Sequence, residues 1–332
     1  MKPKVYFPAS LYGYYQFARP ILEPEVELKF FEGRVFNVEE LAEVFRDIDG
    51  AILSQFEKVT RSVIEAAPRL RALSKYGVAI ETIDLNAATD RGIPVTNCPG
   101  ANSLSVAEYT MALMFTLLRP IPKLDKIVRQ GDWKGARKLV GVDIEGSTLG
   151  LVGVGSVGSL VAQRASAMGM RVIAYDPYQT AEGIAKVGAK KIDSLDDLLS
   201  TADVVSLHAA VTKENRRMLG EKQFRRMKPT AYLINTARAA LVDQDAMVKA
   251  LKEHWISGAA LDVHEPEPIP PDSPLFQLDN VIVTPHHAAS TPRTIERTMR
   301  QTSLNLIKML SGELPEIGLC NPAVRDRFGR QG

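Results

Sequence analysis

The sequence predicts an α/β protein with two doubly wound parallel sheets, and three observations support this. The chain has 332 residues, and because about 150 residues per domain is usual, two domains are expected. Short β-rich runs alternate with helical patterns along most of the chain, which is typical of parallel βαβ units. A glycine-rich turn of the kind that opens such a unit stands in mid-chain, at residues 153–158.

The first elements are four strands and the helices between them. Short apolar runs predict strands, and amphipathic patterns capped by Thr60 and Asp84 predict two of the helices. The predicted strands are residues 4–7, 50–53, 72–76 and 94–96, and the predicted helices are residues 38–45, 60–67 and 84–90. Two further helices follow at residues 103–118 and 121–130, separated by Pro120.

A second series of βα units begins near residue 101. Six apolar runs, each ending at a polar residue, predict a doubly wound sheet of their own. They are residues 147–152, 171–176, 203–207, 231–235, 258–262 and 281–284. A final helix is expected at residues 292–310, capped by Ser290 or Thr291, with Pro292 in its first turn. Because this series starts in mid-chain, the segment after residue 286 is expected to return to the first domain.

The composition excludes several classes of protein. Apolar residues make up 45% and charged residues 24% of the chain, which is ordinary for a globular protein. The net charge of +2 gives no reason to expect a nucleic-acid partner. No apolar run is long enough for a membrane span or a signal peptide, so no membrane partner is expected. Cys98 and Cys320 cannot form a four-thiolate zinc site, so we expect no metal and a cytoplasmic location.

The glycine turn predicts a dinucleotide site. Gly153, Gly155 and Gly158 directly follow one predicted strand and open a helix. The first glycine permits the tight turn, the second admits a pyrophosphate to the backbone, and the third lets the helix pack on the strand. At the end of the next strand, the Asp176 carboxylate is placed to bind the adenosine ribose and repel a 2′-phosphate. No Arg or Lys stands in residues 176–180, so NAD is expected rather than NADP.

Arg238, Glu267 and His286 follow three of the late strands, where open α/β sheets bind their ligands. Such a set suits the reduction of a 2-keto acid. An arginine binds a carboxylate bidentately and polarises a carbonyl, a histidine donates the proton, and a carboxylate favours the protonated histidine. His286 alone would be read equally well as an ordinary loop histidine, but the three side chains together favour a catalytic role.

With these motifs in place, the chain resembles the D-isomer-specific 2-hydroxyacid dehydrogenases, most closely their phosphoglycerate dehydrogenase branch. The resemblance extends over about residues 45–321. Besides the glycine turn, it rests on ordered motifs at residues 77–79, 83–88, 91–95, 102–108, 202–208, 234–238, 259–263 and 283–286. It implies an NAD-dependent oxidoreductase that interconverts a small D-2-hydroxy acid and its 2-keto acid.

The resemblance also implies roles for individual residues. Arg238 should bind the substrate's carboxylate and carbonyl, and the amides of Val78 and Ala79 should bind the same carboxylate in a cleft between the domains. His286 should be the acid/base and also contact the substrate, with Glu267 as its partner. The residues implied for cofactor binding are Gly153, Gly155, Ser156, Val157, Gly158, Asp176, His208, Thr236, Ala237 and Asp262.

The same resemblance implies an architecture and an assembly. A Rossmann NAD-binding domain at residues 102–287 would be inserted in a split, flavodoxin-like substrate domain at residues 1–101 and 288–332. The apolar residues of the helix at 103–118 either pack within the chain or, as the resemblance suggests, form a homodimer interface. The C-terminal regulatory domain of longer phosphoglycerate dehydrogenases is not expected.

Four departures from the family pattern leave the substrate open: Ala239, Ala210, His287 and Glu81. One alternative is a glyoxylate or hydroxypyruvate reductase. A phosphorylated substrate would need extra cations, for which Arg61 and Lys75 are the candidates. The other alternative is a non-enzymatic, NAD-sensing protein of the corepressor type.

Overall fold

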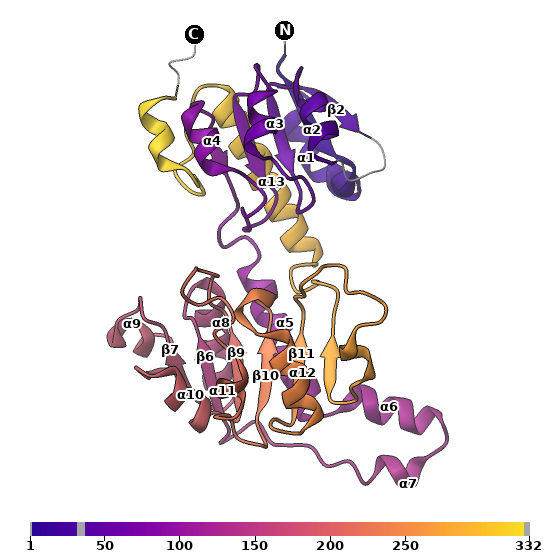
Figure 1. Cartoon of the computed structure of the whole chain (residues 1–332). Helices are drawn as coiled ribbons and strands as arrows, with labels where there is room; N and C mark the ends of the chain where they lie inside the picture. The colour runs from indigo at the N-terminus through magenta and orange to yellow at the C-terminus, as the bar shows by residue number, and fades with distance from the viewer. Residues whose placement is uncertain (1, 32–36, 329–332) are drawn as a thin grey trace. The chain divides into compact units, whose positions relative to one another are not determined.

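The computed structural model describes residues 2–31 and 37–328, and its elements are labelled in Figure 1. The chain divides into two compact units. Unit 1 comprises Met1–Asn102 and Ser290–Gly332, and unit 2 comprises Ser103–Ala289. Within the described ranges, none of the helices combines the length and the apolar character needed to span a bilayer.

In its described residues, unit 1 contains a five-stranded parallel sheet in the order β2-β1-β3-β4-β5. This order is that of flavodoxin-like folds, as expected. The strands are β1 (Lys4–Pro8), β2 (Glu27–Phe31), β3 (Gly50–Leu53), β4 (Ala72–Lys75) and β5 (Val95–Thr96). The sequence did not predict β2, because this edge strand has no buried residue and therefore shows no apolar run.

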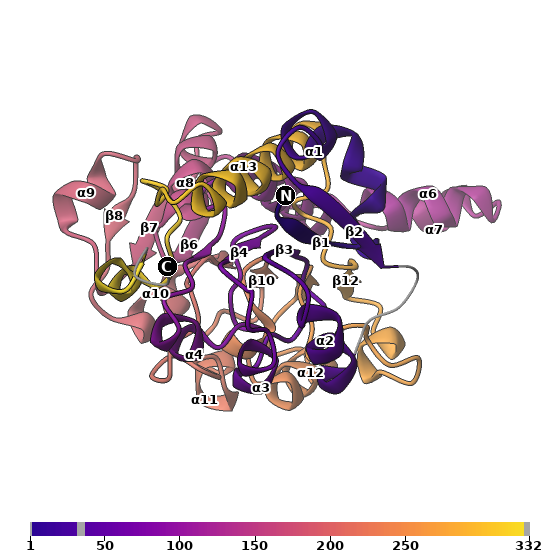
Figure 2. The same cartoon turned by 90° about the horizontal axis from the view of Figure 1, so that it is seen from above.

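Helices cover both faces of this sheet (Figure 2), with α1 and α13 on one face and α2, α3 and α4 on the other. Their bounds are α1 (Tyr15–Leu22), α2 (Val38–Phe45), α3 (Arg61–Glu65), α4 (Leu85–Asp90) and α13 (Pro292–Leu310), with short 3-10 helices η1 (Ala9–Tyr14) and η4 (Pro322–Asp326). Helix α1, with Pro20 inside it, was not predicted. Thr291 caps α13. Met299 and Leu306 of α13 join the core around Ile52 of β3, so the last long helix completes unit 1.

Unit 2, all of which the structure describes, contains a seven-stranded parallel sheet in the order β12-β11-β10-β9-β6-β7-β8. From β8 to β11 this is the Rossmann order. The strands are β6 (Thr148–Val152), β7 (Arg171–Tyr175), β8 (Lys190–Lys191), β9 (Val204–Leu207), β10 (Tyr232–Asn235), β11 (Gly258–Leu261) and β12 (Val281–Val283). Six of them match the predicted strands, whereas the short, lysine-only edge strand β8 was not foreseen.

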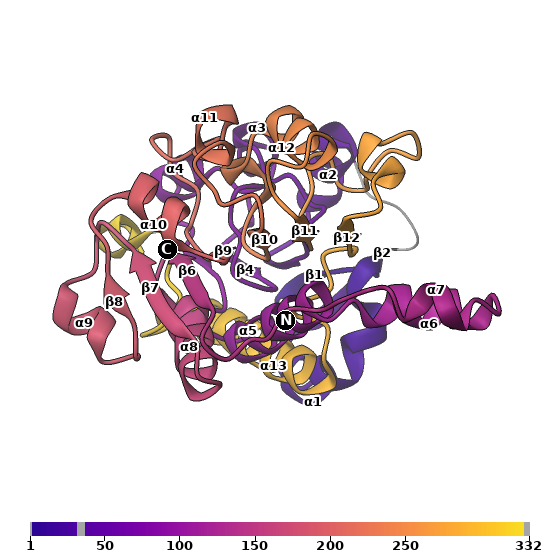
Figure 3. The same ribbon diagram turned by 90° about the horizontal axis from the view of Figure 1, so that it is seen from below.

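The helices of unit 2 form two layers and one projection. Helices α5 and α8 cover one face of the sheet and α10, α11 and α12 the other, while α6 and α7 project away from it (Figure 3). The helices are α5 (Ser103–Leu118), α6 (Ile121–Arg129), α7 (Trp133–Ala136), α8 (Ser156–Ala167), α9 (Ala181–Ala185), α10 (Leu195–Thr201), α11 (Glu221–Phe224), α12 (Gln244–Lys252), η2 (Ala239–Leu241) and η3 (Pro274–Gln277).

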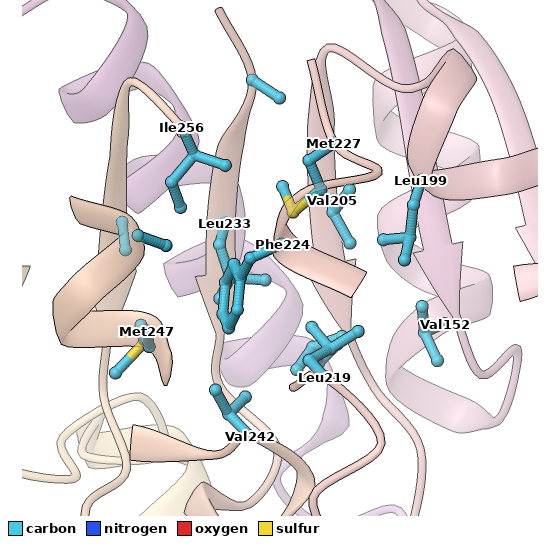
Figure 4. Packing of buried hydrophobic residues seen from close by; sticks show 14 of the residues in the cluster. Val152, Leu199, Val205, Leu219, Phe224, Met227, Leu233, Val242, Met247 and Ile256 are labelled. Atoms are coloured by element: carbon cyan, nitrogen blue, oxygen red, sulfur yellow. The ribbon is translucent and has the colours of Figure 1, made fainter. Parts of the chain in front are cut away.

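Both faces of the unit 2 sheet carry a hydrophobic core, which explains the continuous apolar runs of its strands. On one face, Phe224 packs among Leu219, Leu233 and Met247 (Figure 4). On the other face, α5 contributes Met111, Met114 and other residues to the second core. Helix α5 therefore packs largely within the chain. The sheet is therefore packed on both faces. The candidate residues of unit 2 lie at the carboxyl ends of its strands.

Candidate functional site

The glycine turn between β6 and α8 has the geometry that each glycine predicts. Gly153 has a φ of +94°, and a Cβ on it would lie 2.7 Å from the backbone nitrogen of Ala209. A Cβ on Gly158 would lie 2.3 Å from the carbonyl oxygen of Gly153. A Cβ on Gly155 would meet nothing within 4 Å. Packing therefore requires the first and third glycines, whereas the second borders open space at the first turn of α8.

Asp176, which follows β7, lies against this turn. Its Oδ2 accepts a hydrogen bond from the Val154 amide at 2.8 Å, and its Oδ1 accepts one from the Tyr178 amide at 2.9 Å. Ser156 and Val157 begin α8, so their amides belong to the helix N-terminus. A carboxylate next to an open helix N-terminus matches the ribose and the pyrophosphate of a dinucleotide. These residues fit the cofactor that the glycine pattern predicts.

His208 follows β9 and lies behind the glycine turn. Its Nε2 is 2.9 Å from the hydroxyl oxygen of Ser206. A Cβ on Gly158 would lie 3.5 Å from the Cβ of His208, so the ring's stem borders the base of α8. Burial lowers the pKa of His208 to about 4, because desolvation penalises the charged ring. The ring is therefore neutral at pH 7 and supports the turn without adding charge to it.

Arg238 is held at the end of β10 by a residue that the sequence reasoning missed. The side chain of Asn235 accepts a hydrogen bond from the Ala237 amide at 3.0 Å and donates one to the Arg238 carbonyl at 2.9 Å. The Thr236 hydroxyl pairs with that of Thr110 in α5 at 2.8 Å. An asparagine that ends a buried strand was the signal available, since such side chains bond readily to nearby backbone.

His286 and Glu267 meet directly. Nδ1 of His286 lies 2.9 Å from Oε2 of Glu267, whose other oxygen accepts a hydrogen bond from the His264 amide at 2.9 Å. Burial raises the pKa of Glu267, but the hydrogen bonds from the His286 ring and the His264 amide outweigh it, so the pKa is lowered overall. Glu267 is therefore ionised at neutral pH, and the imidazole remains 42% exposed.

The three predicted catalytic residues all follow the carboxyl ends of strands in the unit 2 sheet. Arg238 follows β10, Glu267 follows β11 and His286 follows β12, and these strands are neighbours in the order β12-β11-β10. Because the strands are parallel, their carboxyl ends lie on the same side. The structure thus brings His286 onto Glu267, while Nη1 of Arg238 donates to the carbonyl of Ala237 at 2.7 Å.

Asp262 directly follows β11. The resemblance implies that it lines the nicotinamide side, and this stays a prediction. In the structure the residue is wholly buried. Its carboxylate accepts hydrogen bonds from the Thr284 hydroxyl and from the amides of His287 and Ala288. The side chain is therefore turned toward the loop that carries His286.

In unit 1, Val78 and Ala79 follow β4 in a loop that Gly77 opens with a φ of +105°. Val78 is 38% exposed, and its carbonyl accepts a hydrogen bond from the Asn97 side chain at 2.7 Å. Among the residues that the structure describes, the amides of Val78 and Ala79 have no hydrogen-bond acceptor. These are two neighbouring donors of the kind that binds a carboxylate.

The two cations considered for a phosphate are already engaged. Lys75 is 2% exposed, and its ammonium donates to the carbonyl of Ser54. The Arg61 guanidinium pairs with Asp90 at 3.2 Å and with Glu65 at 3.8 Å. Over residues 2–31 and 37–328, no three His, Cys, Asp or Glu side chains are grouped so as to hold a metal ion. Both cysteines are free thiols.

Comparison with known proteins is consistent with this geometry. The family model described as "D-isomer specific 2-hydroxyacid dehydrogenase, NAD binding domain" matches residues 111–288. A glyoxylate reductase from Korarchaeum cryptofilum is 42% identical over 278 residues, which is 83% of each chain. A D-3-phosphoglycerate dehydrogenase from Methanocaldococcus jannaschii is 41% identical over 296 residues, which is 89% of this chain but 56% of that protein.

Solved structures extend the likeness to the whole chain. The TT0316 protein from Thermus thermophilus superposes with a TM-score of 0.88 at 35% identity, covering 96% of this chain and 99% of that one. An NADPH-dependent glyoxylate/hydroxypyruvate reductase from Sinorhizobium meliloti, in complex with NADP and malonate, gives a TM-score of 0.86 at 26% identity over 100% of both chains. Both units of the fold therefore have counterparts in this group of proteins.

Proposed function

Because the chain belongs to the D-isomer-specific 2-hydroxyacid dehydrogenase family, we propose that it is an NADH-dependent reductase of a small, unphosphorylated 2-keto acid. Glyoxylate and hydroxypyruvate are the model substrates. The observation that carries the proposal is the contact of His286 with Glu267. It lies at the carboxyl ends of the parallel strands, where Arg238 also follows its strand. Such a set holds a carboxylate, polarises a carbonyl and supplies one proton.

The hydrogen bonds and ion pairs that already engage Lys75 and Arg61 favour an unphosphorylated substrate over 3-phosphoglycerate. A phosphate needs unpaired cations in the substrate site, because its charge must be compensated where water is excluded. Lys75 is buried on the Ser54 carbonyl, and Arg61 is neutralised by Asp90 and Glu65. The similarity to several glyoxylate reductases, one of them 37% identical over 95% of this chain, supports the same choice.

The residues divide the reaction between them. Arg238 binds the substrate's carboxylate and carbonyl oxygen, and the amides of Val78 and Ala79 are proposed as further donors to the carboxylate. The bound dinucleotide supplies the hydride. His286 delivers its proton to the oxygen on C2 as that oxygen becomes negative. Glu267, ionised at neutral pH, stabilises the imidazolium before the transfer and keeps the ring oriented after it.

Asp176 supports a preference for NADH over NADPH. Its carboxylate is bound to the amides of Val154 and Tyr178 and lies beside the glycine turn. A fixed negative charge at this position accepts hydrogen bonds from ribose hydroxyls and repels a 2′-phosphate. Ser156 and Val157, at the N-terminus of α8, are proposed to face the pyrophosphate, with Thr236 and Ala237 on the nicotinamide side.

We further propose a homodimer formed through α5, α6 and α7. In α6, every residue of which is described, no side chain is buried. Apolar side chains are exposed along this region, including Phe115 at 37%, Ile121 at 62%, Trp133 at 64% and Val140 at 88%. Exposed apolar groups gathered on a projection are typical of an interface, and a second copy of the chain is the occupant that the family resemblance suggests.

A reducing compartment, the cytoplasm, is proposed for the chain. Both thiols are free, and burial raises the pKa of Cys98, which keeps it as an unreactive thiol. Free cysteines are common where glutathione and thioredoxin keep thiols reduced. A thiol titration of protein purified without added reductant, giving two thiols per chain, is the expected result; a disulfide-linked product would contradict it.

The test of the function is NADH oxidation, followed at 340 nm, with glyoxylate, hydroxypyruvate, pyruvate, 2-oxoglutarate and 3-phosphohydroxypyruvate. We expect the highest kcat/KM with glyoxylate or hydroxypyruvate, and a lower value with the phosphorylated acid. A preference for 3-phosphohydroxypyruvate would overturn the substrate assignment. Tight NADH binding with no turnover of any acid would overturn the enzymatic proposal and favour a sensing role.

A further inference from the structure

His264, in the loop after β11, is bonded to both segments that carry the proposed acid/base pair. Its backbone amide donates a hydrogen bond to Oε1 of Glu267 at 2.9 Å. Its ring nitrogen Nε2 lies 2.8 Å from the carbonyl oxygen of Thr284, two residues before His286. The side chain is half-buried. One residue therefore holds the Glu267 carboxylate with its backbone and the turn before His286 with its ring.

The ring contact of His264 also determines which of its nitrogens carries the proton. A carbonyl oxygen can only accept a hydrogen bond, so Nε2 of His264 must be the donor to Thr284. In the neutral ring, Nδ1 is then the nitrogen without a proton. The contact is therefore a directed N–H···O bond, and a substitution at residue 264 keeps it only if the new side chain places a donor at the same point.

The Thr284 carbonyl is the atom on which the turn around His286 closes. It accepts a hydrogen bond from the His286 amide at 3.0 Å, and its second lone pair is available for the His264 ring. His286 has a φ of +53°, in the left-handed region that residues other than glycine rarely adopt. Such a conformation persists only where the surroundings hold it. Asp262 binds the Thr284 hydroxyl, whereas His264 binds the carbonyl itself.

We propose that His264 is a positioning residue, whose two hydrogen bonds hold Glu267 and the turn of His286 so that Nδ1 of His286 meets Oε2 of Glu267. The proposal rests on the proposed function, since the pair that it aligns is the proposed proton donor and its partner. The His264 amide occupies Oε1 of Glu267, which leaves Oε2 for the His286 ring. The ring bond to Thr284 then places His286 at the distance that this contact requires.

Three substitutions separate the hydrogen bond of the His264 ring from its size. His264→Phe keeps a planar ring and loses the donor. His264→Gln carries an NH₂ group at about the position of Nε2, whereas the side chain of His264→Asn is too short to place one there. All three keep the backbone amide that binds Glu267. Arg216→Gln is the matched control, because it breaks an ion pair with Glu265 in the same loop, between side chains that are 53% and 60% exposed.

The kinetic test is the order of kcat among these variants in glyoxylate reduction. His264→Phe and His264→Asn are expected to lower kcat about tenfold, His264→Gln less than threefold and Arg216→Gln less than twofold. The KM for glyoxylate should change less than threefold, because the orientation of a proton donor acts on the chemical step. Equal losses in His264→Phe and His264→Gln, or a lower melting temperature with kcat unchanged, would overturn the proposal.

A double-mutant cycle tests whether His264 acts through His286. In a His286→Gln background, His264→Phe is expected to lower the residual kcat less than twofold, because the group that it positions is gone. A tenfold loss in both backgrounds would mean that His264 contributes independently of His286, against the proposal. Where His264→Phe does not fold, His264→Asn takes its place in the cycle.

Two further readouts need no turnover. Nitrogen NMR of the neutral wild-type ring should find the proton of His264 on Nε2. His264→Phe and His264→Asn should speed deuterium uptake in a peptide covering residues 284–290, and His264→Gln should not. A proton on Nδ1, or wild-type uptake in His264→Phe and His264→Asn, would contradict the proposal. If the wild-type protein reduces no 2-keto acid, the proposed function fails, whereas these readouts still decide whether His264 holds the turn.

Discussion

The imidazole Nδ1 of His286 and the carboxylate Oε2 of Glu267 lie 2.9 Å apart, although the two residues are 19 positions apart in the chain, on either side of strand β12. The contact leaves Nε2 of the same ring as the position for proton transfer, since Nδ1 is occupied. Glu267 in turn is fixed by the His264 amide. The pair therefore has the geometry of a proton donor whose ring is oriented by a carboxylate.

Replacing the proton donor tests the central assignment. His286→Gln should lower kcat for glyoxylate reduction about 10²- to 10⁴-fold, because general acid catalysis contributes that much. NADH binding should stay within twofold of wild type. His254→Gln, which changes an exposed histidine just after α12, is the control and should retain full activity. Comparable turnover in the two variants would remove His286 from the mechanism.

The pH dependence of reduction should report on Glu267. Burial raises its pKa, but the hydrogen bonds from His286 and His264 lower it by more. The pKa is therefore lowered overall, and Glu267 stays ionised throughout the neutral range. Its own titration therefore falls below the working pH. In Glu267→Gln, the partner of Nδ1 of His286 is uncharged at every pH, so kcat/KM should be lower throughout and the acid fall that follows protonation of Glu267 should disappear. Superimposable pH profiles of wild type and variant would show that the carboxylate does not act on the proton donor.

Asp176 should determine the choice of cofactor. Asp176→Asn removes the charge and is expected to weaken NADH binding about tenfold, as for a lost hydrogen bond to a charged group. NADPH binding should weaken less or improve, because the 2′-phosphate is no longer repelled. Fluorescence titrations give the dissociation constants of NADH and NADPH, and the ratio of the two constants measures the cofactor preference. Asp193→Asn, at a carboxylate that is 93% exposed, is the control; an Asp176→Asn ratio equal to the control's would refute the assignment.

His208 should make the protein less stable in mild acid. Burial lowers its pKa to about 4, from 6.5. Between these values the unfolded chain binds a proton that the folded chain does not, so stability falls as pH decreases. From pH 6.5 to pH 5 the free energy of unfolding should drop by up to about 2 kcal/mol. Urea unfolding should show a smaller drop in His208→Asn and the full drop in His254→Asn; equal slopes in all three would contradict the prediction.

The projecting helices should hold the dimer together. Trp133, at the start of α7, is 64% exposed, and Trp133→Glu places a charge in the proposed interface. The variant should dissociate to monomers at concentrations where the wild-type chain sediments as a dimer. Tyr178→Glu, at a side chain that is 84% exposed in another part of unit 2, should leave the assembly unchanged. A monomeric wild type, or a dimer insensitive to Trp133→Glu, would overturn the proposed interface.

The two strands that sequence reasoning missed share a physical cause, and the missed helix has another. β2 and β8 lie at sheet edges, where one side faces solvent and little apolar surface is buried, so neither has an apolar run. Helix α1 contains Pro20, which usually argues against a helix. The elements in the centres of both sheets were predicted nearly to the residue, because burial on two faces demands continuous apolar sequence.

For the site, the sequence alone determined the chemistry of each position. The type of a side chain and its place at the end of a strand depend only on neighbouring residues. Such local patterns include the glycine turn, the acid at the end of the next strand, and Arg238, Glu267 and His286 after late strands. Only the tertiary structure decided how these side chains are held. It turned Asp262 inward onto Thr284 and the His287 amide, and buried Lys75 on Ser54. Such partners come from different strands, and only the packing of the sheet brings them within hydrogen-bond distance.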